Sequence, residues 1–276
     1  MSQNLSKTRI LTECAVMLAL ATALSLLKLV DLPYGGSVTI ACMLPVVIVS
    51  YRSGIRYGLL TGLAMGVLQQ LLSLNTLSYV STWQSVLAVI LLDYVIAFAV
   101  IGFGGIFRKI IRNQAAAIVL GSILVGLLRY LCHVISGCTV WAGLSIPTEA
   151  ALTYSLIYNA TYMLPETIVL IIVGYYVASV LDFRDEKLHF ISREKTPKAS
   201  FLFRALAGLL AGGALVFDVA SVFAKLQNAE TGEFDITGIH SVNGTLLLIV
   251  TAVCAVAAVI LLVIGNRRAG SAEKKQ

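Results

Sequence analysis

Long apolar runs constrain the fold of this chain more than any other feature of its sequence. A helix that crosses the hydrocarbon core of a membrane needs about 20 predominantly apolar residues. Eight apolar runs, most of them near this length, lie at about residues 8–29, 38–53, 56–75, 83–107, 115–137, 150–181, 201–225 and 243–265. No window alternates between apolar and polar residues for long enough to indicate a β-barrel. The pattern predicts an all-α integral membrane protein.

Lysine and arginine residues predict which ends of these helices face the cytoplasm. They fall at alternate ends of successive runs, at Lys7, Arg9, Arg52, Arg56, 108–112 and 184–198. The connections at the opposite ends contain neither residue type: 30–37, 73–82 and 137–149. Because basic loops are retained on the cytoplasmic side, we expect a multi-pass membrane protein with both termini in the cytoplasm. These loops account for the net charge of +6, and no nucleic-acid partner is expected.

A charged segment divides the predicted helices into two groups. We expect a six-helix membrane domain, a charged cytoplasmic linker, and a two-helix transmembrane extension with a cytoplasmic tail, at residues 1–185, 186–200 and 201–276. The loop within the extension carries Glu230, Glu233 and Asp235, which suits the outer side of the membrane. Asp218 lies inside the seventh apolar run, and the sequence assigns it no role.

Common catalytic motifs are missing from the chain. It contains no G-x-x-x-x-G-K-[ST] phosphate loop, no H-E-x-x-H and no G-x-S-x-G. Its five cysteines lie mostly in apolar runs and follow no disulfide or metal-ligand spacing. We therefore expect binding rather than enzymatic chemistry, with no cofactor and no metal. Any pumping would need a partner that supplies energy.

Asp93 stands in the middle of the apolar stretch VILLDYVIAF, residues 89–98. A carboxylate at the centre of a membrane helix costs roughly 2.5 to 3.5 kcal/mol on insertion scales, so it normally faces a cavity or a partner. Asp93 is therefore a candidate counter-charge for a cationic ligand, or an acceptor for the ligand's amino group. A structural ion pair with Arg129 is the alternative. Tyr94 contacts a different part of the same site or packs within the bundle.

Two further segments carry polar and aromatic groups in the outer half of the membrane. In RYLCHVISGCTVW, Arg129, His133 and Gly137 recur every four residues and so share one helix face, with Trp141 in the following loop. Their plainer interpretations are a packing histidine, a glycine that caps the helix and a tryptophan of the interfacial belt.

In the other segment, YSLIYNATYMLPE, Tyr154 shares a face with Tyr158, and Asn159 lies one step round the helix. Asn159 could instead bond between helices, and Glu166 could satisfy backbone donors freed by Pro165. Together the three segments offer an anion, an imidazole, an amide and several aromatic rings. This inventory suits a small, flat, heteroaromatic cation.

Five segments of the chain resemble a known family when they are compared in order and spacing. They are LTECAVMLALATALS, YGGSVTIACMLPVVIVSYRSG, LLDYVIAFAVIGFGGIFRK, LLRYLCHVISGCTVW and YSLIYNATYMLPE. Over about residues 8–183 they resemble the thiamine-binding S components, the ThiT type, of energy-coupling factor (ECF) transporters. The resemblance implies a six-helix S-component bundle, here followed by two additional C-terminal transmembrane helices.

The same resemblance implies function and partners. It implies high-affinity capture of thiamine from the outside, with delivery by a transmembrane coupling protein and two cytoplasmic ATPases. Matched by position, the substrate-binding residues of the family fall on Asp93, Tyr94, His133, Gly137, Trp141, Tyr154 and Asn159. In the family the acidic position may be glutamate. Some members also carry a first-loop tryptophan over the ligand, which this chain lacks; Tyr34 is a candidate replacement.

Ala15 and Ala19 form a small-xxx-small pair on the first helix, which permits close approach of another helix. The resemblance assigns this face to docking on the coupling protein, and packing within the bundle is the alternative. For the glycines at 58, 62 and 66 we expect packing within the bundle.

Three other functions remain open from the sequence. The first is an S component for a different vitamin or a thiamine precursor. The second is a proton-coupled secondary carrier with Asp93 as the proton site. The third is a membrane enzyme, against which the lack of a second ionisable group at catalytic spacing beside Asp93 counts.

Overall fold

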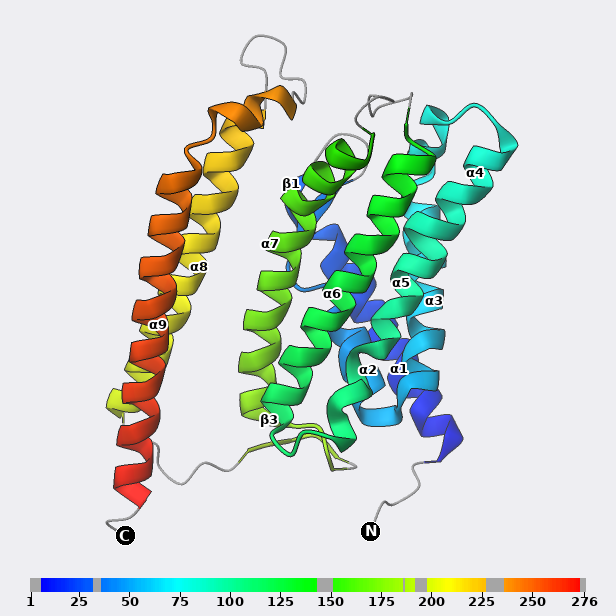
Figure 1. Ribbon diagram of the computed structural model, residues 1–276. Helices are drawn as coiled ribbons and strands as arrows, with labels where there is room; N and C mark the ends of the chain where they lie inside the picture. The colour runs from blue at the N-terminus through cyan, green and yellow to red at the C-terminus, as the bar shows by residue number, and fades with distance from the viewer. Residues whose placement is uncertain are drawn as a thin grey trace. The chain divides into compact units, whose positions relative to one another are not determined.

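Helices dominate the computed structural model (Figure 1) and confirm the predicted all-α class. The chain divides into two compact units, Met1–Phe190 and Ile191–Gln276. The structure describes residues 6–31, 36–142, 151–185, 187–191, 198–226 and 236–273. Tyr34, the acidic loop residues at 230, 233 and 235, and part of the predicted linker lie outside these ranges.

Six helices in the described part of the chain are long and apolar enough to cross a membrane. Four belong to the first unit: α1 (Lys7–Leu26), the continuous segment Trp83–Lys109, α6 (Gln114–Thr139) and α7 (Ala151–Val180). The segment Trp83–Lys109 changes its winding along its length, through α4 (Trp83–Val89), the π-helical η3 (Ile90–Ile96), α5 (Ala97–Ala99) and the 3₁₀-helical η4 (Val100–Lys109). The other two helices, α8 (Lys198–Leu226) and α9 (Gly244–Glu273), belong to the second unit.

The predicted span 38–53 is wrong as a continuous helix. Its first residues belong to β2 (Ser37–Thr39), which pairs antiparallel with β1 (Lys28–Asp31). Only α2 (Leu44–Ser53) is helical, and its 10 residues extend about 15 Å, half of a hydrocarbon core of about 30 Å. Nearly all of α2 is buried inside the bundle. Apolar composition alone does not distinguish a buried short helix from a lipid-exposed span.

Glu166 holds the non-helical approach to α2 against the middle of α7. The Thr39 amide donates to Glu166 Oε2 at 2.5 Å, and the Thr39 hydroxyl donates to Oε1 at 2.7 Å. Cys42 Sγ also lies 3.5 Å from Oε1. Irregular backbone at membrane depth is tolerated only where protein or a cavity surrounds it. Glu166 therefore serves β2 rather than donors freed by Pro165, the role considered from the sequence.

Replacing Glu166 with alanine is expected to destabilise the first unit. The substitution leaves the buried Thr39 amide without an acceptor, which costs about 1–3 kcal/mol in the free energy of unfolding. Thermal unfolding of the purified protein in detergent would measure the loss. Glu166→Gln keeps one acceptor oxygen and should lose less, whereas equal stability of Glu166→Ala and the parent would contradict this role.

The glycines of α3 (Ile55–Leu72) pack within the bundle, as predicted. A Cβ at Gly62 would lie 2.4 Å from the carbonyl oxygen of Phe98. One at Gly66 would lie 2.5 Å from the carbonyl oxygen of Tyr94. Since real Cβ atoms do not come so close, only glycine allows α3 to lie directly against the winding change in Trp83–Lys109. This contact positions Tyr94 and its neighbour Asp93.

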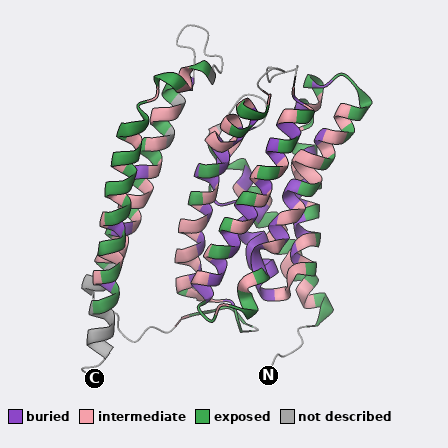
Figure 2. Ribbon diagram, in the orientation of Figure 1, coloured by how far each residue is buried: buried purple, intermediate pink, exposed green. Residues whose placement is uncertain are grey.

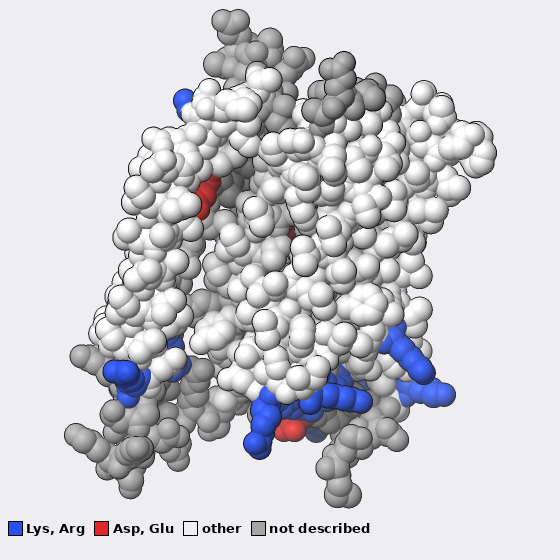
Figure 3. All heavy atoms as spheres, viewed as in Figure 1, with Lys and Arg blue, Asp and Glu red and all other residues white. Residues whose placement is uncertain are grey.

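Basic side chains gather at one end of the first unit (Figure 3). They come from the start of α1, the α2–α3 junction and the end of η4. Arg52 is buried there, pairs with Glu13 of α1, and donates to the carbonyl oxygens of Phe183 and Asp185 at 3.1 Å each. These contacts join α1, α2 and the segment that follows α7, where β3 (Leu181–Asp182) pairs with β4 (His189–Phe190).

The second unit is a helical hairpin of α8 (Lys198–Leu226) and α9 (Gly244–Glu273), with the short η6 (Ile236–Ser241) between them. Figure 2 shows α9 exposed along most of its length, and its exposed residues are largely apolar, as on a lipid-facing helix. Asp218, to which the sequence assigned no role, accepts a hydrogen bond of 2.6 Å from the Thr251 hydroxyl. Arg204 donates to Asn266 at 2.8 Å. Both contacts join α8 to α9.

Candidate functional site

A cavity of about 320 Å³ lies inside the first unit, between α1, β2, α3, Trp83–Lys109, α6, α7 and the turn η2 (Leu74–Tyr79). This volume suits a small molecule. All seven residues predicted to bind a ligand line it: Asp93, Tyr94, His133, Gly137, Trp141, Tyr154 and Asn159. The fold therefore brings together three segments that are far apart in the sequence.

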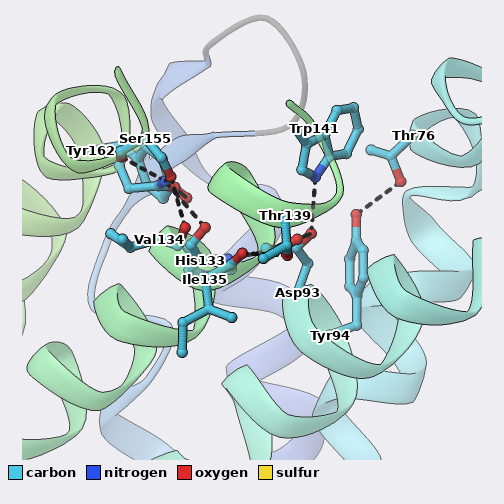
Figure 4. Close-up of polar contacts among 12 residues, drawn as sticks. Thr76, Asp93, Tyr94, His133, Val134, Ile135, Thr139, Trp141, Ser155 and Tyr162 are labelled. Carbon is cyan, nitrogen blue, oxygen red and sulfur yellow. Dashed lines mark hydrogen bonds and ion pairs between the residues drawn. The ribbon is translucent and has the colours of Figure 1, made fainter. Parts of the chain in front are cut away.

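Asp93 lies in the π-helical segment η3, and three side chains donate to its carboxylate (Figure 4). His133 Nδ1 lies 2.9 Å from Oδ1, while Ser136 Oγ and the Trp141 indole nitrogen lie 2.6 and 3.2 Å from Oδ2. Short π-helical segments within α-helices are frequently found at functional sites. Both oxygens of the Asp93 carboxylate are therefore held by protein side chains, and Asp93 lines the cavity.

The ion pair between Asp93 and Arg129, the alternative raised from the sequence, does not form among the described residues. The Arg129 guanidinium instead lies over the Phe98 ring, 4.3 Å from its centroid. No basic side chain other than His133 contacts the Asp93 carboxylate in the described part of the chain. Asp93 is therefore free of a permanently charged protein partner.

The contact with Asp93 decides which nitrogen of His133 carries the proton. A carboxylate accepts, so in the neutral imidazole Nδ1 carries the hydrogen and Nε2 becomes an acceptor. Nε2 is buried and has no partner in the described structure, and the His133 side chain lines the cavity. With a neutral imidazole, the site thus offers an acceptor nitrogen beside the carboxylate.

Trp141 is part of the cavity wall and not a belt residue at the membrane surface. It is only 8% exposed, whereas the chain's other tryptophan, Trp83, is 71% exposed. Its indole nitrogen donates to Asp93, and its ring lies 6.4 Å from that of Tyr79. Val80 and Val89 pack around it. The buried ring is in position to contact a ligand in the cavity.

Asn159 makes hydrogen bonds between helices, as its alternative interpretation held. Its amide nitrogen donates to the carbonyl oxygens of Ser155 at 2.8 Å and His133 at 3.3 Å. Its oxygen accepts from the Tyr162 hydroxyl at 2.6 Å. The side chain lines the cavity, but it already joins α7 to the helix turn that carries His133.

Gly137 lets α6 and α7 approach each other closely. A Cβ there would lie 2.1 Å from the hydroxyl oxygen of Ser155 and 3.3 Å from the amide nitrogen of Asn159. Because α6 continues to Thr139, the helix-cap interpretation is wrong. The glycine allows Ser155 and Asn159 to reach the backbone carbonyls of α6.

Aromatic rings surround much of the remaining cavity. Tyr158 and Tyr162 meet edge to face with centroids 5.8 Å apart, and Tyr162 meets His133 in the same way at 6.0 Å. Tyr154 packs against the cluster that contains Trp141. The Tyr94 hydroxyl lies 3.1 Å from that of Thr76 (Figure 4). Aromatic faces attract organic cations, so the walls and Asp93 favour the same kind of ligand.

Several residues of the site were not found from the sequence. Ser136 was detectable, because it lies three residues after His133 and so shares its helix face. The lining from α1, β1, β2, α3 and the residue that caps α3 had no such signal: Ser25, Lys28, Ser37, Thr39, Gln69 and Ser73. Among the described residues, no group of three or more His, Cys, Asp or Glu side chains is placed to hold a metal ion.

The family model described as thiamine transporter protein matches residues 11–182. The chain belongs to this thiamine transporter family. The family is one of transporters and not of enzymes, and the resemblance noted in the sequence is confirmed.

Known members of the thiamine transporter family agree with this assignment. The thiamine transporter ThiT of Bacillus subtilis is 36% identical over 184 residues, which cover 63% of this chain and 91% of that protein. The solved structure of ThiT from Listeria monocytogenes aligns with a TM-score of 0.52 at 24% identity, over 63% of this chain and 95% of that one. This likeness concerns the fold. The family match ends at residue 182, before the helical hairpin of the second unit.

Proposed function

We propose that this protein captures thiamine with high affinity on the outer side of a bacterial plasma membrane, as the S component of an ECF-type importer. Family membership supports thiamine as the substrate. The observation that carries the proposal is Asp93: a carboxylate in an aromatic-lined cavity, held by the side chains of His133, Ser136 and Trp141 and not paired with Arg129. Such a site gains from a ligand that brings its own positive charge.

The chemistry of thiamine suits the groups that line the cavity. Its thiazolium ring carries a permanent positive charge, which the Asp93 carboxylate and the surrounding aromatic faces attract. Its aminopyrimidine ring offers amino hydrogens, for which the Nε2 atom of His133 is a free acceptor. Trp141 supplies a flat, buried face for stacking. The carboxylate thus attracts the positively charged thiazolium ring, and the acceptor nitrogen binds the amino group of the neutral pyrimidine ring.

Partners supply the energy in this proposal. The chain has no phosphate loop, so a transmembrane coupling protein and two cytoplasmic ATPases would drive release. The basic end of the first unit (Figure 3) would then face the cytoplasm, because basic loops are retained there. The whole subunit would reorient when these partners change shape.

Titration of the purified full chain with thiamine tests this proposal directly. Because Trp141 is one of only two tryptophans and lies in the cavity, binding is expected to quench its fluorescence. Trp141→Ala should lose the quenching and, since a desolvated cation–π contact is worth about 2 kcal/mol, should bind about tenfold or more weakly by calorimetry.

Trp83→Phe is the matched control, because it removes the exposed tryptophan and should keep both the quenching and the affinity. Quenching that survives in Trp141→Ala would assign the signal to Trp83. A panel of other vitamins tests the substrate. A strong response to another ring system, beside a weak response to thiamine, would count against thiamine as the ligand.

A further inference from the structure

Arg129 is a buried cation on the cavity wall with no role in the site described above. Its exposed fraction is 8%, and it lies one helical turn before His133 on α6, on the same face. Nε has no hydrogen-bond partner in the described structure, and the guanidinium carbon stacks on Phe98 at 4.3 Å. A cation–π contact offsets only part of the cost of burying a guanidinium.

Neither carboxylate of the cavity neutralises Arg129. Glu166 lies within electrostatic range, but its oxygens accept from Thr39 and Cys42. Asp93 is occupied by the donors already described. The described residues contain no ion pair to Arg129. Its donors are therefore available to a group inside the cavity.

The cavity consequently has separated charges. Asp93 contacts His133, whereas Arg129 lies four residues earlier on α6, about 6 Å along the helix axis and further from Trp141. A cationic ring is attracted by the Asp93 carboxylate and repelled by the Arg129 guanidinium. A substituent that carries an oxygen acceptor is attracted to Arg129, whose planar fork of donors suits hydroxyl and phosphate oxygens.

We propose that Arg129 binds an oxygen on the side chain of the cationic ligand, and so orients the ligand in the cavity. This inference rests on the proposed function. In thiamine the oxygen is the hydroxyl of the hydroxyethyl group on the thiazolium ring, and in thiamine monophosphate it is a phosphate ester at the same place. The shared chemistry is an oxygen acceptor held a short distance from a fixed positive charge.

The test compares three ligands by calorimetry on the purified full chain: thiamine, thiamine monophosphate, and a thiamine analogue in which hydrogen replaces the hydroxyl. Hydrogen bonds from charged groups are the stronger kind, so the parent protein should bind the analogue about tenfold or more weakly than thiamine. In Arg129→Gln the ratio of the affinity for thiamine to the affinity for the analogue should fall towards one. Thiamine monophosphate should lose more affinity than thiamine, and Arg129→Lys should recover part of that loss.

Phe98→Leu is the control for a merely structural role, since it removes the ring beneath the guanidinium and leaves the guanidinium itself. Phe98→Leu should leave the ratio of the affinities for thiamine and the analogue as it is in the parent protein. A ratio that is unchanged in Arg129→Gln, while thiamine still binds, would overturn the role of Arg129 alone. A parent protein that binds none of the three ligands would overturn both this role and the proposed function.

Discussion

Replacing Asp93 with asparagine is expected to weaken thiamine binding by about a hundredfold or more while leaving the fold intact. Removing one partner of a buried charge pair costs about 2–5 kcal/mol in binding free energy, and each 1.4 kcal/mol is a factor of about ten. The protein itself should tolerate the change, because Asp93 has no permanently charged protein partner that would be left buried and alone.

The loss of thiamine affinity should be larger than removal of the negative charge alone would cause, because asparagine also changes the hydrogen-bond pattern. Ser136 and Trp141 both donate to one oxygen of Asp93, so the amide oxygen would take that place. The amide NH₂ would then face Nδ1 of His133 and donate to it. Nδ1 would lose its proton and Nε2 would gain one. The free acceptor in the cavity would become a donor.

Calorimetry with thiamine would measure the effect, and thermal unfolding would check the fold. Ser136→Ala is the matched control: it removes one neutral donor to the same carboxylate and should change affinity far less. Asp93→Glu keeps the charge and should retain much of the binding. An asparagine variant that binds thiamine as tightly as the parent would remove the counter-charge from the proposal.

A bulky residue at Ala15 or Ala19 is expected to abolish transport while thiamine binding is preserved. Both alanines are exposed on α1, whose buried positions, such as Ala21 and Ser25, lie elsewhere on the helix. Packing within the bundle therefore does not account for their small size. Small residues at this spacing allow another helix to approach closely, and tryptophan would prevent that approach.

Uptake by the protein reconstituted with its proposed coupling partners would be compared with thiamine binding by the purified chain. Leu127→Trp is a suitable control, since Leu127 is 53% exposed on α6 and away from α1 in the sequence. The control should keep both activities. Parallel loss of binding and transport in Ala15→Trp would mean that the alanines serve the structure of α1 rather than docking.

Much of the cavity could be predicted because helical spacing is local. Arg129, His133 and Gly137 share a face of α6 wherever that helix lies, and a carboxylate in an apolar span needs a polar environment in any fold. Both arguments hold without knowledge of the neighbouring helices. All seven predicted residues accordingly line one cavity.

Alternative interpretations that the structure excludes concern what a residue faces. Trp141 resembled a belt tryptophan by position, but it is buried against Asp93. Gly137 resembled a cap, but α7 packs directly against it. Glu166 lies beside Pro165 in the sequence, yet its hydrogen bonds go to Thr39, which is 127 residues away along the chain. Sequence spacing along one helix contains no information about the partner of that helix.

The sequence by itself determined that this protein is an all-α membrane protein, and which helix faces carry polar groups, because apolar length and helical period are properties of single segments. Only the tertiary structure decided that β2 and α2 are buried inside the bundle, that Asp93 bonds to His133, Ser136 and Trp141, and that Arg129 stacks on Phe98. These contacts and this burial depend on which side chains from distant segments meet, and that is determined by the close packing of helices against one another.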